Sequence, residues 1–135
     1  MDEGMQDHRA RIAEFLDRFG RERNITLPPL DDQGVGMIQR GSAVVSIHVL
    51  EDKNVLLLLA RVAKQPTLDE TKAKRLLSLS FVETGDAAFA LHPQTGDLYL
   101  RILRGLDGLD YEEFEHNVHS IAQAADHWDD RLASL

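Results

Sequence analysis

The sequence predicts an α+β fold of one domain, residues 1–135, with the element order α-β-β-β-α-β-β-α. Apolar residues recur at helical spacing near both ends of the chain. Between them lie short strand-like runs, three before and two after a middle helical segment. The turns within each group are too short for crossover connections, so we expect an antiparallel sheet with helices packed on it. With 43% hydrophobic residues, the chain can bury one sizeable core.

The first helix is predicted from Ile12, Phe15, Leu16 and Phe19, which recur at i, i+3, i+4 and i+7. Gly20 either ends this helix or occupies its last turn. The segment 27–30 contains two consecutive prolines, which exclude helix and predict an extended connection to the sheet.

Three strands are predicted next, near residues 35–40, 43–50 and 55–62. Short turns join them, so they should form an antiparallel meander. The second strand alternates. One face, which we assign to the core, carries Ala43, Val45, Ile47 and Val49; the other, half apolar and suited to a contact surface, carries Val44, Ser46, His48 and Leu50.

The third strand is apolar on both faces over residues 55–60, so both faces need cover. Two arrangements satisfy this. Either helices of the same chain cover both faces, or one face meets another chain, as a dimer partner or a bound peptide.

The middle helix shows a related pattern. Thr67 and Glu70 have the spacing of a capping box, which predicts a helix running to about Leu79. Its apolar residues fall on two sides: Ala73, Leu76 and Leu77 on one, Leu68 and Leu79 on the other. A helix with two apolar sides often packs against two bodies, which favours dimerisation.

A late hairpin and a long helix complete the pattern. Strands near 87–92 and 97–103 are joined by a turn at 93–96. Asp110 and Glu113 form a second capping box. The helix that follows carries an apolar face made of Phe114, Val118, Ile121, Ala122, Ala125, Trp128 and Leu132.

Composition excludes several classes of function. The net charge of −8 argues against nucleic acid or an anionic membrane as partner, because both require a basic surface. The absence of cysteine excludes disulfides and thiol chemistry. No secretory signal and no apolar run of spanning length is visible, so we expect a cytoplasmic protein.

Candidate catalytic groups are few. His116 and His119 lie three residues apart near carboxylates and could ligate a metal, but a solvated face of an acidic helix explains them more simply. The paired aspartates 31–32 and 129–130 lie at a turn and near a helix end, where aspartate is common without catalysis. We therefore expect no enzymatic activity, no metal and no cofactor.

Three segments resemble the class I type III secretion chaperones, the Tir-chaperone (CesT-like) family. They are residues 12–20, the hairpin 88–100, and the last helix from 110–114 to 125–128. The resemblance implies a homodimeric cytoplasmic chaperone that binds an extended amino-terminal segment of a secreted effector and keeps it competent for export. The two prolines in 27–30 and the polar break 39–42 depart from the family's usual pattern.

The resemblance also implies site residues and partners. Leu68, Leu76 and Leu79 match the family's dimer interface. The effector groove would include Phe15, Phe19, Val44 and Leu50. The last helix holds most of the excess acid. It is either simply the solvated face of a packed helix or a contact for a basic partner, such as a secretion ATPase or a basic effector segment. The alternative function is a regulatory or structural dimeric module of the same fold without a secretion client.

Overall fold

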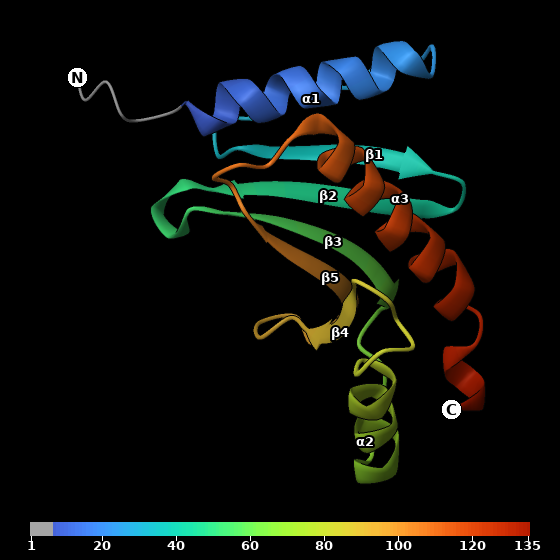
Figure 1. Cartoon of the computed structure of the whole chain (residues 1–135). Coiled ribbons are helices and arrows are strands. Elements are labelled where there is room, and N and C mark those ends of the chain that lie inside the picture. Colours follow the sequence, from blue (N-terminus) through green and yellow to red (C-terminus); the bar gives the residue numbers. More distant parts are fainter. Residues whose placement is uncertain (1–6) are drawn as a thin grey trace.

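The computed structural model describes residues 7–135, and its element order is the predicted one. Three helices and five strands form the fold (Figure 1). The helices are α1 (His8–Glu22), α2 (Glu70–Leu79) and α3 (Tyr111–Trp128), and the strands are β1 (Val35–Arg40), β2 (Ala43–Leu50), β3 (Val55–Ala63), β4 (Ala88–Leu91) and β5 (Leu98–Gly105). Two short 3-10 helices, Glu51–Lys53 and Leu132–Ser134, follow β2 and α3.

All strands pair antiparallel in the order β1-β2-β3-β5-β4, as the short connections predict. Helix α3 packs against β2, β3 and β5, while α1 contacts α3 and β2. Figure 1 shows α3 crossing in front of the sheet, α1 beside β1, and α2 at the opposite end, near β4. The helices α1 and α3 thus cover one face of the sheet.

The alternation along β2 is confirmed, since Ala43, Val45, Ile47 and Val49 are all buried. On β3, the buried face consists of Leu56, Leu58, Ala60 and Val62. The other apolar face of β3 is only half covered. Two arrangements were left open for this strand. The one in which helices of the same chain cover both of its faces is therefore wrong.

Helix α2 begins later than predicted. Its N-cap is Asp69, whose extended backbone lets the carboxylate accept a hydrogen bond from the Lys72 amide at 2.8 Å. The predicted cap, Thr67, lies outside the helix, so that assignment was wrong. At α3 the predicted cap is confirmed: Asp110 accepts from the Glu113 amide at 2.8 Å.

Gly20 lies in the last turn of α1, the second of its two predicted positions. A side chain there would place its Cβ 2.7 Å from the Ile25 carbonyl oxygen, closer than packing allows. Glycine thus lets the chain fold back tightly as it leaves the helix.

Long-range polar contacts fix α1 to α3 and to the segment that leads into it. The Arg11 guanidinium donates to the Leu109 carbonyl at 2.6 Å and to the Leu106 carbonyl. The Tyr111 hydroxyl donates to Glu22 at 2.7 Å. Four aromatic rings, Phe15, Phe19, Tyr111 and Phe114, pack in edge-to-face and tilted contacts between the helices. These contacts hold both helices on one face and leave the other face of the sheet uncovered.

Candidate functional site

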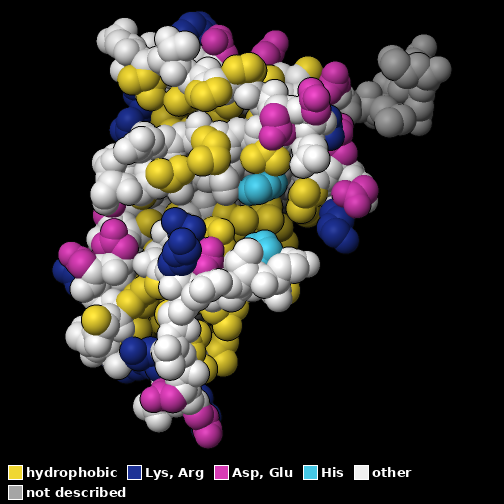
Figure 2. Space-filling view, turned by 180° about the vertical axis from the view of Figure 1, so that it is seen from behind, with side chains coloured by type: hydrophobic (Ala, Val, Ile, Leu, Met, Phe, Trp, Pro, Cys, Tyr) yellow, Lys and Arg dark blue, Asp and Glu magenta, His cyan; other side chains and the backbone are white. Residues whose placement is uncertain are grey.

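The uncovered face of the sheet is the first candidate surface. Side chains meet there across four strands, as in the row Val35, His48, Leu57 and Leu103. Three of its apolar side chains are close to half exposed: Met37 at 48%, Val44 at 44% and Leu103 at 45%. Other apolar side chains of this face are Val35, Leu50, Val55, Leu57 and Leu59. Figure 2 shows hydrophobic side chains gathered over the middle of the molecule seen from this side. We call this surface the open face.

His48 is the histidine of the open face. Its ring nitrogen Nε2 lies 2.9 Å from the Ser46 hydroxyl, and its imidazole is half-buried. Burial lowers the pKa of His48, because it disfavours the charged ring; the nearby Asp31 carboxylate partly opposes this effect. The imidazole is therefore neutral at neutral pH, and the charges on this face are those of Arg101, which lies opposite Leu59, and of Arg61, which lies opposite Tyr99.

The outer edge of β1 adjoins the open face. The Val49 amide donates to the Gly34 carbonyl, which fixes the alternation and turns the main-chain groups of Val35, Met37 and Gln39 outward. The main-chain groups of Val35 already have hydrogen-bond partners in Asp31. The Asp31 backbone amide donates to the Val35 carbonyl, and the Asp31 carboxylate accepts from the Val35 amide. Met37 and Gln39 are thus available for pairing with a strand of another chain.

The residues predicted for an effector groove do not form one surface. Val44 and Leu50 lie on the open face, as their strand positions require. Phe15 lies on the covered side and is partly buried against Tyr111 and Phe114. Phe19 is 0% exposed and belongs to the core, so its assignment to a groove is corrected. Phe15 and Phe19 are four residues apart and lie on the same side of α1. The packing of α3 against that side encloses Phe19 completely and Phe15 only in part.

The sequence reasoning missed Met37 and Leu103. Period-two alternation along β1 and β5, applied as it was to β2, places both on the open face.

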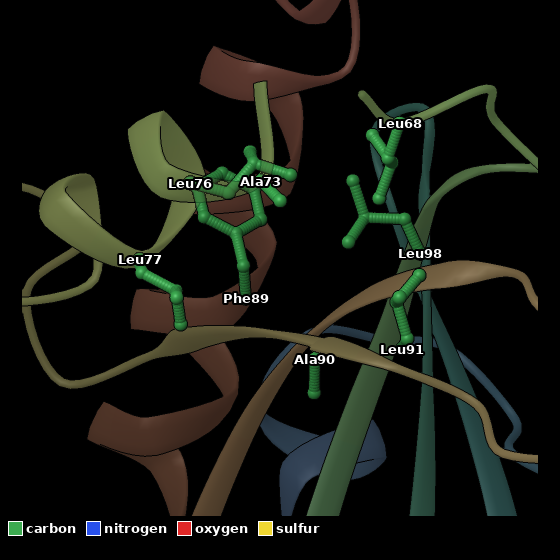
Figure 3. Close-up of a pocket in the computed structure, with 8 residues that line it drawn as sticks. All are labelled: Leu68, Ala73, Leu76, Leu77, Phe89, Ala90, Leu91 and Leu98. Atoms are coloured by element: carbon green, nitrogen blue, oxygen red, sulfur yellow. The ribbon is translucent and has the colours of Figure 1, made fainter. Parts of the chain in front are cut away.

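The second candidate surface surrounds an apolar cavity of about 230 Å³ between α2, β4 and β5 (Figure 3). All its lining side chains are apolar: Leu68, Ala73, Leu76, Leu77, Phe89, Ala90, Leu91 and Leu98. Two of the residues predicted for dimerisation, Leu76 and Leu79, are buried within the chain itself, and Leu68 is half-buried. The predicted division of α2 was wrong, because Leu76 and Leu79 share the inner side.

The outer side of α2 carries the exposed apolar residues. Leu77 is 71% exposed, and Phe81 and Val82, just beyond the helix, are 91% and 67% exposed. Leu91, on β4 beside the cavity, is 53% exposed. We call Leu77, Phe81, Val82 and Leu91 the α2 patch. Leu77 and Leu91 line the same cavity, and Phe81 and Val82 follow Leu77 closely in the chain. Large exposed apolar side chains of this kind are typical of an interface.

The candidate metal ligands are not brought together. His116 lies 3.3 Å from an Asp86 carboxylate oxygen, whereas His119 approaches Arg23 at 3.3 Å. In residues 7–135, no group of three or more histidine or carboxylate side chains is placed to hold a metal ion. None of the helices in the same range is both long and apolar enough to cross a membrane.

An uncovered apolar sheet face, a free strand edge and an exposed apolar patch define a small α+β binding protein. The sequence matches the Tir chaperone protein (CesT) family over residues 14–129. The chain therefore belongs to that family, and the resemblance stated above is confirmed. No curated protein matches the sequence.

Solved structures share the fold. The ExsC-ExsE complex contains a chain with a TM-score of 0.79 and 22% identity, covering 94% of this chain and 97% of that one. A chain of the HopA1-SchA chaperone-effector complex gives a TM-score of 0.73 at 12% identity, with coverage of 93% and 98%. The ExoT-SpcS complex from Pseudomonas aeruginosa gives 0.64 at 17% identity, with coverage of 91% and 98%.

One similar fold comes from another context. YbjN, a putative transcription regulator from E. coli, matches with a TM-score of 0.53 and 11% identity, covering 87% of this chain and 91% of that one.

Proposed function

We propose that this protein is a type III secretion chaperone, which binds an extended amino-terminal segment of an effector in the cytoplasm and keeps it competent for export. Family membership supports the class of protein. The observation that carries the binding mode is the open face, whose apolar side chains lie beside the free main-chain groups of Met37 and Gln39.

Strand addition at β1 would use both features. An incoming strand would exchange hydrogen bonds with Met37 and Gln39 and place alternate side chains over the open face. Because only these two residues of β1 offer free main-chain groups, the paired segment should be short. Most of the affinity should come from apolar contact with the open face.

We further propose a homodimer formed through the α2 patch. Leu77, Phe81 and Val82 are apolar side chains exposed to water, and Leu77 also lines the apolar cavity. An isologous interface would bring two copies of the patch together and remove both from water. In this proposal the side of α2 that forms the dimer is the side that carries Leu77, and not the side that carries Leu76 and Leu79.

The acidic surface of α3 is the candidate contact for a basic partner, including a secretion ATPase. Glu112, Glu113, His116 and His119 are exposed there and make no part of the open face. This surface is therefore separate from the proposed effector site.

The test is coexpression with the amino-terminal segment of an effector encoded beside this gene. The segment should copurify, resist proteolysis only in the complex, and acquire no globular core. Met37→Asp with Val44→Asp should abolish copurification, because an incoming apolar segment would bury their carboxylates unpaired. Both side chains are close to half exposed, so the variant should stay folded.

Gln39→Glu is the matched control, since it adds charge at the same edge and removes no apolar area. If the doubly substituted protein still binds the segment as the parent does, the open face is not the effector site. A folded dimer that binds no such segment would favour the alternative, a regulatory or structural module of this fold.

A further inference from the structure

We infer that the end of β5 is a second docking site, which accepts a short extended segment of a partner polypeptide carrying a lysine or arginine side chain. The site lies at the edge of the sheet opposite β1 and does not depend on the effector-binding role of the open face. Four features of the structure carry the inference.

The first feature is a free strand edge. β4 pairs with β5 only as far as the pair Ala88 and Arg101, whereas β5 continues to Gly105. The Leu106 amide donates to the Asn54 carbonyl on the β3 side, so the main-chain groups of Leu103 and Gly105 point the other way, past the end of β4. Arg104 donates to the Leu103 carbonyl. The amides of Leu103 and Gly105 and the Gly105 carbonyl are left for an incoming strand.

The second feature is Gly105 itself. A Cβ at this position would meet no atom within 4 Å, and the backbone does not have a positive φ that demands glycine. Nothing within residues 7–135 therefore requires glycine here. Glycine in a strand commonly marks the close approach of another backbone, which this edge would provide.

The third feature is a buried amide without a partner. Asn117 on α3 is 1% exposed, and its Nδ2 makes no hydrogen bond with any atom of residues 7–135. It lines a cavity of about 250 Å³ together with Arg104 of β5 and Asp110, Glu112, Glu113 and His116. A buried donor left unsatisfied is costly. A main-chain carbonyl of a docked segment, entering the cavity from the β5 edge, would accept from it.

The fourth feature is charge. Asp110, Glu112 and Glu113 are exposed around the cavity, while its one arginine, Arg104, already faces Asp86 at 3.8 Å. The carboxylates that line the cavity therefore outnumber its arginine. A basic side chain on the docked segment complements these carboxylates, whereas an acidic one is repelled.

The test uses the whole protein, labelled with ¹⁵N, and a blocked synthetic hexapeptide of alternating lysine and valine. Its addition should shift the amide signals of Leu103 and Gly105 and the side-chain amide of Asn117, and raising the salt concentration should weaken binding. The matching peptide of glutamate and valine should not bind. Signals of Met37 and Gln39 should stay in place, which separates this site from the β1 edge.

Gly105→Pro and Gly105→Ala form a matched pair. Proline removes only an outward amide, so binding should weaken about fivefold, the equivalent of one net hydrogen bond of about 1 kcal/mol. Alanine keeps that amide and adds only a Cβ where the docked backbone approaches, so it should weaken binding less than proline does. A lysine–valine peptide with alternate main-chain nitrogens methylated makes the same test without altering the protein, and should not bind.

Three results would overturn the inference. The lysine–valine peptide fails to bind, or it binds equally when methylated, or its shifts spread over the acidic side chains without involving Leu103 and Gly105. In the last case the acidic surface attracts cations without strand pairing.

Discussion

Replacing Phe81 by aspartate tests the proposed dimer most directly. The side chain is 91% exposed in the single chain, so its loss should change monomer stability by no more than about 0.5 kcal/mol. Burying a phenylalanine side chain fully is worth about 1.5–3 kcal/mol. A two-fold interface buries it twice, so Phe81→Asp should weaken dimerisation by about 3–6 kcal/mol, or roughly two to four orders of magnitude in Kd.

The assay is light scattering coupled to size-exclusion chromatography over a range of protein concentrations, with thermal melting alongside. The unmodified protein should have a dimer mass at micromolar concentration. Phe81→Asp should have a monomer mass and a Tm, measured under monomeric conditions, near that of the parent. Phe81→Leu is the matched control, because it keeps an apolar side chain and should remain dimeric. Leu76→Asp should instead unfold the chain, since Leu76 is 4% exposed.

Two results would refute the reasoning. A monomer mass for the unmodified protein at micromolar concentration would remove the dimer. A dimer of unchanged Kd in the Phe81→Asp variant would place the interface elsewhere than the α2 patch.

Three further predictions concern the monomer. Asp110→Ala removes the N-cap of α3 and should lower the free energy of unfolding by about 1 kcal/mol in urea titration; an unchanged midpoint would contradict the capping role. Burial and the hydrogen bond to Glu22 raise the pKa of Tyr111 to about 12. The stability that this group contributes should therefore be complete below pH 10 and lost as the pH rises through 12. Ultraviolet titration of the tyrosine and thermal melting across this range check this. The pKa of His48 lies below its ordinary value of 6.5, so its contribution should be present above pH 6.5 and lost as pH falls through the lowered pKa; a His48 pKa at or above 6.5 in NMR titration would contradict this.

The order of elements and the antiparallel sheet could be read from the sequence because they depend on local signals. Alternation along residues 43–50 fixes which side chains share a face, and short turns forbid parallel crossovers. The cap of α3 was likewise local, since Asp110 needs only the amide three residues on. The predicted N-cap of α2 was wrong because Thr67 and Asp69 both have side chains that can cap a helix, and only the path of the chain decides between them.

The candidate surfaces depended on tertiary packing. Periodicity places Phe15 and Phe19 on the same side of α1, but α3 encloses only Phe19 completely. Periodicity likewise predicts apolar residues on two sides of α2, but it does not show which side packs against the rest of the chain. That choice buries Leu76 and Leu79 and leaves Leu77 in water.

By itself, then, the sequence determined the elements, their pairing directions and the faces on which side chains lie, because these follow from backbone geometry over a few residues. Only the tertiary structure decided which apolar faces are covered, since burial depends on segments far apart in the chain. The unpaired Asn117 amide and the free end of β5 are of the second kind: the first follows from the packing that buries this side chain, and the second from β4 pairing no further than Ala88.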